Sequence, residues 1–187
     1  MPAAAGFLKP AVRYEGAMKT TLPFKLLDWI DDNREHLKPP VCNKEMFADS
    51  GFIVQVVGGP NSRSDYHVDE GPELFYQVEG EMLLKTVQDG EFVDIPIGEG
   101  EIFMLPARVP HSPQRLPNTV GIVVERPREA HELDGFVWFC PKCANKLHEE
   151  YLHVADIVKD LPPVFERFYG STAARTCKRC GNVVPPK

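Results

Sequence analysis

The sequence predicts an all-β-dominated fold, in which an antiparallel β-barrel is preceded by one helix and followed by a small metal-binding module. Three observations support this prediction. Between residues 51 and 125, short apolar runs alternate with turn residues, which is typical of antiparallel sandwiches and barrels. The chain of 187 residues contains 18 prolines and 14 glycines, enough to separate many short strands. Four of its five cysteines form two Cys-x-x-Cys pairs near the C-terminus.

The composition is that of a globular protein with one principal core. Hydrophobic residues make up 43% of the chain and charged residues 26%. The net charge of −6, without any basic block, argues against a nucleic acid partner. The N-terminus lacks the features of a signal peptide, and no apolar run approaches the roughly 18 residues that span a bilayer. We therefore expect a cytoplasmic protein that binds neither nucleic acid nor membrane.

The elements follow in order along the chain. Residues 1–19 show no periodicity and are expected to form a flexible extension. Apolar residues at helical spacing predict a helix from Pro23 that ends before the Lys38-Pro39-Pro40 break. Six strands are then predicted by alternation and turn signals, at residues 52–57, 74–79, 81–87, 91–97, 101–105 and 119–125.

The tail has a different pattern. It predicts a strand at 136–139, helical stretches near 144–151 and 163–169, and one Cys-x-x-Cys pair on either side of the helical stretches. We expect a flexible extension (1–19), a barrel that carries a catalytic metal site (20–135) and a C-terminal four-cysteine module (136–187).

Two histidines and a carboxylate occur at motif spacing. His67, Asp69, Glu73 and Gly80 follow the pattern H-x-H-x(3,4)-E-x(6)-G, with Asp69 in place of the second histidine. A second segment follows G-x(5)-P-x-G-x(2)-H-x(3)-N, with Arg108 and Arg115 in place of the glycine and the asparagine; its members are Gly100, Pro106, Arg108, His111 and Arg115. These segments resemble the two cupin motifs, which implies a single cupin barrel, a jelly-roll or double-stranded β-helix.

The substituted histidine leaves three candidate metal ligands, His67, Glu73 and His111. Two histidines and one carboxylate on one face of a metal, with open positions opposite, are typical of non-heme Fe(II) sites that activate O₂. Zn²⁺ with the same ligands, used for hydrolysis, is the competing interpretation. Arg63 and Arg115 each lie four residues from a candidate ligand, and Glu125 ends the last barrel strand. Because arginine binds carboxylates bidentately, this set favours a small substrate that carries a carboxylate and a donor group.

The cysteines form the pattern C-x₂-C-x₃₃-C-x₂-C, made by Cys140, Cys143, Cys177 and Cys180. Four thiolates leave no open coordination position, so we expect a structural site. The ligands alone allow either Fe or Zn.

Taken together, these segments resemble 3-hydroxyanthranilate 3,4-dioxygenases of the single-cupin bacterial and fungal type, which carry a rubredoxin-like C-terminal site. The resemblance covers residues 22 to about 181 and rests on the two motifs, the two cysteine pairs and the segments 37–43, 56–67, 73–80, 105–115 and 121–125. It implies an Fe(II)-dependent enzyme that opens the ring of 3-hydroxyanthranilate with O₂. The product, 2-amino-3-carboxymuconate semialdehyde, leads to quinolinate and NAD in tryptophan catabolism by the kynurenine route.

The resemblance also assigns roles to residues. His67, Glu73 and His111 would hold the catalytic Fe(II), and the four-cysteine site would hold a second Fe. Arg63, Arg115 and Glu125 would be catalytic and would contact the substrate. Glu73 and the loop residue Asn43 would also contact the substrate. A homodimer is implied as well. The alternative hypothesis is a non-catalytic metal cupin that binds a small acid and carries a zinc ribbon.

Overall fold

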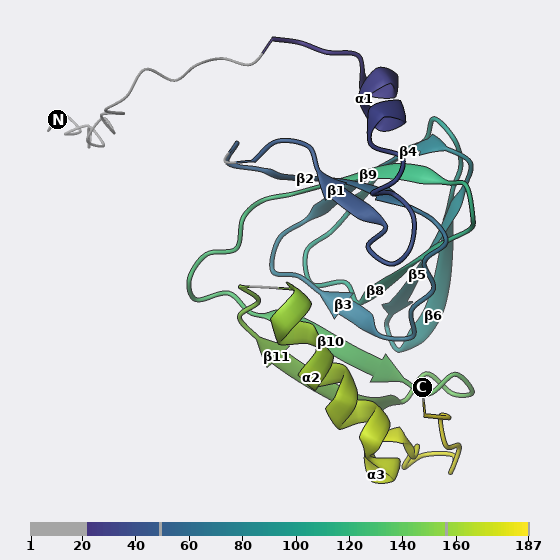
Figure 1. Cartoon of the computed structure of the whole chain (residues 1–187). Helices are drawn as coiled ribbons and strands as arrows, with labels where there is room; N and C mark the ends of the chain where they lie inside the picture. The colour runs from purple at the N-terminus through teal and green to yellow at the C-terminus, as the bar shows by residue number, and fades with distance from the viewer. Residues whose placement is uncertain (1–21, 49, 156, 187) are drawn as a thin grey trace, which may run out of the picture.

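The computed structural model describes residues 22–48, 50–155 and 157–186, so the predicted extension at 1–19 lies outside the described residues (Figure 1). Three helices and eleven strands make up this part of the chain: α1 (Leu26–Asp32), β1 (Asn43–Glu45), β2 (Ile53–Gly58), β3 (Tyr66–Val68), β4 (Glu73–Glu79), β5 (Met82–Gln88), β6 (Glu91–Ile97), β7 (Ile102–Leu105), β8 (His111–Arg115), β9 (Val120–Glu125), β10 (Asp134–Phe139), β11 (Lys146–Leu152), α2 (Ile157–Gly170) and α3 (Thr172–Arg175).

The strands form two antiparallel sheets, which confirms the predicted cupin-type barrel. One sheet has the order β1-β2-β9-β4-β7 and the other the order β11-β10-β3-β8-β5-β6. All six predicted barrel strands are present within a residue or two of their predicted ends. Buried side chains from both sheets form one apolar cluster between them, made by Phe75, Met82, Leu84, Ile97, Leu105 and Val123. This core fixes the spacing of the two sheets, and the polar side chains of the site lie between the same sheets.

The predicted N-terminal helix is confirmed as α1, although it begins at Leu26 and not at Pro23. Its buried residue Ile30 packs with Leu37 on the outer face of the first sheet, against Val56 and Val120. Arg34, just after the helix, also makes a bidentate ion pair with Glu79 at the end of β4. The helix therefore covers part of the outer face of the first sheet.

The helix predicted near 144–151 is wrong, because these residues form β11. Leu147 and Tyr151 have helical spacing, but the segment pairs with β10 over its whole length, including Trp138 with His148. The strand prediction at 136–139 is confirmed by β10, and the helix prediction near 163–169 by α2.

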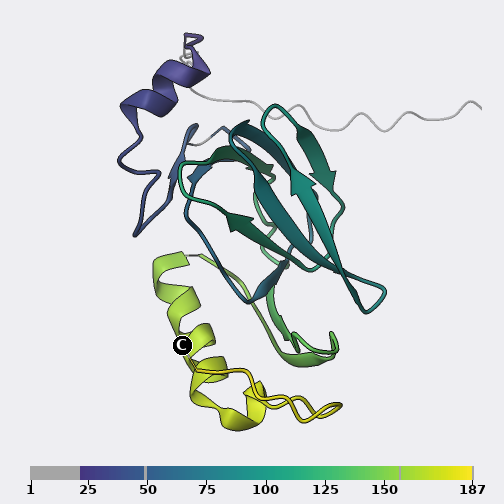
Figure 2. The same ribbon diagram turned by 90° about the vertical axis from the view of Figure 1, so that its right-hand side faces the viewer.

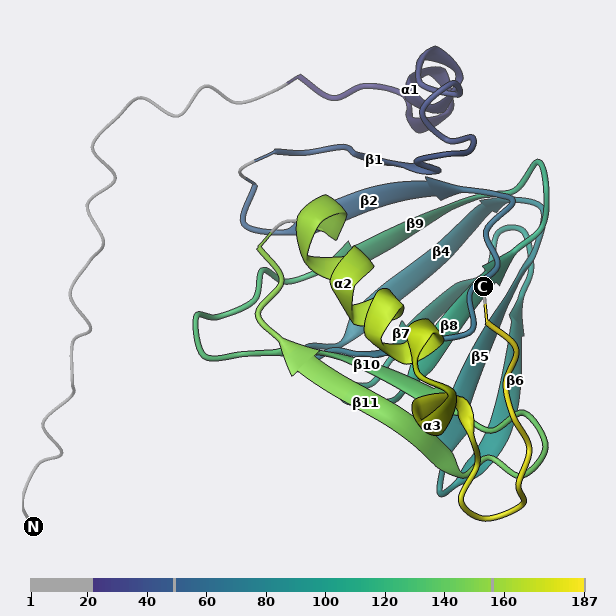
Figure 3. The same ribbon diagram turned by 60° about the horizontal axis from the view of Figure 1, so that its bottom comes forward.

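The tail has its own apolar cluster. Phe136 and Trp138 of β10 pack against Val164 and Phe168 of α2, and the rings of Trp138 and Phe168 stack 4.4 Å apart. In Figures 1 and 2 the two C-terminal helices lie at the opposite end of the molecule from α1, and Figure 3 shows α2 running along β10 and β11. Because β10 also pairs with β3, the second sheet continues from the barrel into the tail, across the predicted boundary at residue 135.

A membrane-spanning helix is not found: within the described ranges, each helix is too short or too polar to cross a bilayer.

Candidate metal centre and active site

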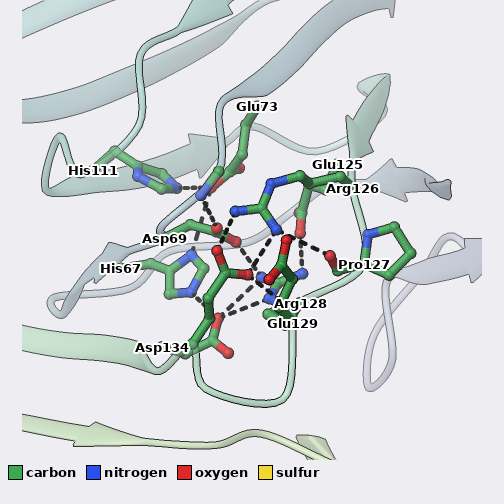
Figure 4. A network of polar contacts seen from close by, with 12 residues as sticks. His67, Asp69, Glu73, His111, Glu125, Arg126, Pro127, Arg128, Glu129 and Asp134 are labelled. Carbon is green, nitrogen blue, oxygen red and sulfur yellow. Dashed lines mark hydrogen bonds and ion pairs between the residues drawn. The ribbon is translucent and has the colours of Figure 1, made fainter. Parts of the chain in front are cut away.

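The three predicted ligands lie on barrel strands, and the structure brings them together (Figure 4). His67 is the middle residue of β3, His111 begins β8, and the two are direct partners across the ladder. Glu73 begins β4 in the opposite sheet. Their candidate ligand atoms all lie within 4.8 Å of one another. Both histidines had been expected in connecting segments, but short strands fix them more firmly.

Each histidine has one ring nitrogen facing Glu73 and the other nitrogen held by an acceptor. Nε2 of His111 lies 3.0 Å from Glu73 Oε1, while its Nδ1 lies 3.0 Å from the carbonyl oxygen of Val109. Nδ1 of His67 lies 3.6 Å from the same Glu73 oxygen, while its Nε2 lies 2.7 Å from Asp134 Oδ1. Acceptors at the rear nitrogens hold a proton there, so the front nitrogen of each ring is the one that a metal ion beside Glu73 would bind.

This arrangement fits a metal ion. Glu73 is buried, and its Oε1 atom has no hydrogen-bond partner among the described residues, which is costly for a carboxylate oxygen unless a cation binds it. Burial opposes the ionisation of Glu73, but His111 and His67 outweigh burial and lower the pKa of the carboxyl group. Burial also opposes the charging of His67, but Asp134 and Glu73 raise its pKa to about 9. The site therefore favours a positive charge beside Glu73, which a divalent metal ion would supply.

Arg115 is a buried cation inside the barrel. It lies four residues after His111 on β8, so both side chains project from the same face of the strand. Its side chain is 4% exposed, and Nη1 donates to Gln77 Oε1 of the opposite sheet over 3.0 Å. Burial lowers the pKa of Arg115 to about 10, so it remains charged at neutral pH. Within the described part of the chain no carboxylate pairs with it, which leaves its charge available to an anionic ligand.

The other predicted site residues occupy different surroundings. Glu125 ends β9, and Arg128 donates to it over 2.5 Å. Burial and the charge of Glu73 raise the pKa of Glu125. The guanidinium of Arg63 donates to buried Asp65, and its charge also acts on His67. Asn43 lies exposed on β1, where its amide donates to the carbonyl oxygen of Val41 over 3.4 Å.

Sequence reasoning missed three polar residues that the structure places at the site. Gln77 alternates with Phe75 and Glu73 on the inner face of β4, so the strand pattern could have indicated it. Asp134 opens the apolar strand β10 and is 3% exposed, and a charge at the start of a buried strand was its signal. Arg128 lies in the connection between β9 and β10, where the sequence offers no periodicity.

The four cysteines converge at the far end of β10. The Sγ atoms lie 3.6 Å apart for Cys140 and Cys180, 3.6 Å for Cys143 and Cys177, and 3.5 Å for Cys143 and Cys180. These distances are far longer than a disulfide bond and close to the ~3.8 Å edge of a tetrahedral thiolate site. Burial would raise the pKa of Cys177, but the N–H groups of Cys180 and Arg179 lower it to about 6. The cluster therefore fits a tetrahedral metal ion.

Comparisons with known proteins identify the type of enzyme that the chain resembles. A family model described as 3-hydroxyanthranilic acid dioxygenase matches residues 18–169. A 3-hydroxyanthranilate 3,4-dioxygenase from Xanthomonas oryzae pv. oryzae is 56% identical over 163 residues, which cover 87% of this chain and 92% of that protein. The enzyme of the same name from Bacillus thuringiensis is 45% identical over 168 residues, which cover 89% of this chain and 94% of that protein.

Solved structures give more distant likenesses. A cupin-2 domain containing protein from Shewanella frigidimarina matches with a TM-score of 0.42 and 17% identity, covering 53% of this chain and 92% of that one.

Proposed function

The chain belongs to the 3-hydroxyanthranilic acid dioxygenase family, and from this premise we propose how its residues perform the reaction. It is a ring-cleaving dioxygenase that converts 3-hydroxyanthranilate and O₂ to 2-amino-3-carboxymuconate semialdehyde, the precursor of quinolinate. The observation that carries the proposal is the convergence of two imidazoles and one carboxylate on a single point inside the barrel. The alternative hypothesis, a non-catalytic cupin that binds small acids, is not favoured, because curated relatives that are 56% and 45% identical are named as this dioxygenase.

His67, Glu73 and His111 would hold Fe(II). When bound, Fe(II) supplies open coordination positions at which an aromatic substrate and O₂ can react with each other. Three protein ligands would leave coordination positions free for the substrate and O₂. The strand ladder that pairs His67 with His111 keeps the two imidazoles fixed, so little reorganisation is needed when the metal binds.

Arg115 would bind the carboxylate of the substrate. Among the described residues, the side-chain hydrogen-bond partner of its buried guanidinium is the neutral amide of Gln77, so a carboxylate would gain a strong charge-assisted contact there. Glu125 would accept a hydrogen bond from the amino or hydroxyl group, and its raised pKa suits it to take up the proton released there. Arg63 would add positive charge near the reacting atoms. Asn43 would approach the substrate only if the β1 segment moved toward the site.

We extend the proposal to the second metal, the location and the assembly. The four-cysteine site would hold Fe, as the resemblance implies, and the enzyme would act in the cytoplasm. It would form a homodimer through the outer face of the first sheet. Two rows of side chains cross this face from β2 to β7. One row is apolar and contains Val54, Val124, Leu74 and Met104. In the other row α1 covers Val56 and packs against Ile122, and Tyr76 and Ile102 continue the row to the edge of the sheet. An apolar face of this kind is complementary to a second copy of itself.

The experiment that tests the function is anaerobic reconstitution with Fe(II), followed by O₂ uptake with 3-hydroxyanthranilate. Uptake should require both the metal and the substrate, and Zn²⁺ should not replace Fe(II). His67→Ala, Glu73→Ala and His111→Ala should each lose catalytic metal and activity while the fold is retained. Any one of these variants that kept full metal content and full turnover would contradict the ligand assignment.

A further inference from the structure

One guanidinium contacts three carboxylates at the edge of the metal centre (Figure 4). Arg128 Nη2 lies 2.5 Å from Asp69 Oδ2 and 2.9 Å from Asp134 Oδ1, and Nη1 lies 2.5 Å from Glu125 Oε2. Asp69 and Asp134 are buried, and Glu125 is half-buried. Burying four charged groups away from water costs free energy unless each charge is paired, and Arg128 pairs with all three carboxylates.

The network reaches the metal centre through Asp134. Asp134 Oδ1 accepts from Arg128 and lies 2.7 Å from Nε2 of His67. The opposite ring nitrogen of His67 faces Glu73. Asp134 therefore fixes both the rotation of this imidazole and the nitrogen that carries its proton.

The same guanidinium reaches the proposed substrate contact. Arg128 and Glu125 lie three residues apart in the chain, at the point where β9 leaves the barrel, so the ion pair holds this carboxylate against the site. His67, Asp69 and Asp134 could by themselves hold a cation, but Arg128 already lies between the two aspartates and provides the positive charge.

We propose that Asp134 and Arg128 are positioning residues, in which Asp134 orients the metal ligand His67 and Arg128 locks Asp134 and Glu125 into one rigid unit. The inference rests on the proposed function of the site. It goes beyond that function because neither residue contacts the metal or the substrate. One arginine would thus set the relative placement of a metal ligand and a substrate contact.

The test measures metal affinity without turnover. Mn²⁺ is the probe, because an imidazole and carboxylate site accepts it whereas a thiolate site selects softer ions. Protein that retains its four-cysteine metal is stripped at the His67–Glu73–His111 site by a mild chelator, and Mn²⁺ binding is followed by the loss of the free-ion EPR signal. Asp134→Ala should weaken Mn²⁺ binding by about 10- to 100-fold. Asp134→Asn, which keeps an acceptor oxygen, should recover most of the affinity and guards against misfolding of the alanine variant.

Arg128→Lys separates the two halves of the proposal. Lysine keeps the charge but cannot contact three carboxylates in a plane, so Mn²⁺ affinity should fall and the KM for 3-hydroxyanthranilate should rise together. Glu125→Gln should raise the KM while Mn²⁺ affinity stays unchanged. Arg126→Gln is the matched control, because Arg126 lies in the same connection but pairs with Glu132. It should change neither quantity.

The possible outcomes distinguish a failure of the positioning role from a failure of the proposed metal site. If His67→Ala loses Mn²⁺ while folded Asp134→Ala binds it as tightly as the unmodified chain, the positioning role is wrong and the metal site stands. If His67→Ala also binds Mn²⁺ normally, the ligand assignment itself is wrong. A lower melting temperature of Asp134→Ala with unchanged Mn²⁺ affinity would mean that Asp134 has only a structural role.

Discussion

At the scale of single residues, we propose that Arg115 selects substrates that carry a carboxylate. A cation buried beside a neutral amide is stabilised by an anionic ligand, and a carboxylate can accept two of its N–H groups at once. Arg115→Ala should therefore leave Fe(II) loading unchanged and weaken 3-hydroxyanthranilate binding by about 2–4 kcal/mol. Arg115→Lys should recover only part of this loss, since an ammonium group cannot make the planar two-donor contact.

The measurement is a pair of anaerobic titrations, one with 3-hydroxyanthranilate and one with 2-aminophenol, which lacks the carboxylate. With 2-aminophenol the unmodified chain and Arg115→Ala should bind almost equally. Equal weakening of both ligands would mean that Arg115 supports the barrel and does not bind the carboxylate.

Gly121 on β9 offers a second way to disturb Arg115, without removing its charge. A Cβ atom on this residue would lie 2.6 Å from Arg115 Nη1 and 2.7 Å from Gln77 Oε1, so both side chains would have to move. Gly121→Ala should weaken substrate binding about tenfold, or about 1.4 kcal/mol. Metal content by elemental analysis should not change. Substrate affinity equal to that of the unmodified chain would show that the Arg115–Gln77 pair is not held in a required position.

At the scale of elements, the sequence predicted long alternating strands well and short or locally ambiguous ones poorly. β4 and β9 alternate over six or seven residues, and their pattern is visible without any neighbour. β3 has three residues and β8 contains a proline, so neither strand could be recognised from its own sequence. Both are identified by their pairing with neighbouring strands. For β11, pairing with β10 overrode a helical spacing. The candidate ligands His67, Glu73 and His111 nevertheless lie together as the motifs indicated, because motif spacing does not depend on the secondary structure assigned.

The contacts around those ligands could not be predicted in the same way. Asp134 lies 67 residues after His67, and no local pattern links them. Arg128 links Asp69, which lies far from it in sequence, to the nearby Glu125 and Asp134, and Gln77 meets Arg115 across the barrel. Such contacts arise from the closure of the two sheets, which hydrophobic periodicity predicts only as a class of fold.

The two cysteine knuckles repeat one backbone design with one difference. The N–H of Cys140 donates to the carbonyl of Asn145 and that of Cys177 to Asn182, both over 2.8 Å. The residue after the second cysteine is left-handed in each: Ala144 has φ 53° and Gly181 has φ 73°. An alanine in the left-handed conformation is about 1–2 kcal/mol less favourable than a glycine. Part of this difference is offset, because glycine loses more backbone entropy than alanine on folding.

Ala144→Gly should therefore stabilise the metal-loaded tail by about 0.5–1 kcal/mol, and Gly181→Ala should destabilise it by about 1 kcal/mol. No atom lies within 4 Å of a Cβ built on Gly181, so its effect would come from the backbone alone. Denaturant unfolding measures both changes when it is followed by tryptophan fluorescence in a Trp29→Phe background, which leaves Trp138 as the one tryptophan. Stabilisation by Gly181→Ala would contradict the assignment of strain to these positions.

At the scale of the whole molecule, the apolar outer face of the first sheet predicts the assembly. Ile102 and Met104 on the edge strand β7 are 67% and 54% exposed, although both belong to continuous apolar rows. Met104→Glu should produce monomers in analytical ultracentrifugation without lowering the metal content. Leu116→Glu, at an exposed leucine in the turn before β9, is the matched control and should leave the assembly intact. An unmodified chain that sediments as a monomer at micromolar concentration would remove the proposed dimer.

The strand β10 connects the two candidate metal centres, since Asp134 at one end contacts His67 and Cys140 follows directly after the other end. Over six residues of extended chain the separation along the strand is about 20 Å. Three register pairs hold β10 against β3, among them Phe136 with His67, and these pairs do not depend on the cysteine site. The barrel end of the strand should therefore keep its place when the far end loses its metal.

Cys177→Ser tests this independence, because Cys177 belongs to the knuckle that is not on β10. The variant should lose one metal ion per chain and unfold its tail at lower denaturant concentration, since metal binding at a structural site contributes directly to folding free energy. Fe(II) at the His67–Glu73–His111 site should persist, together with O₂ uptake driven by 3-hydroxyanthranilate. Elemental analysis and O₂ uptake on the same sample measure both centres. If the folded variant keeps its catalytic Fe(II) but no longer opens the ring, the cysteine site affects catalysis. The change would then be transmitted from the cysteine site to His67 by β10.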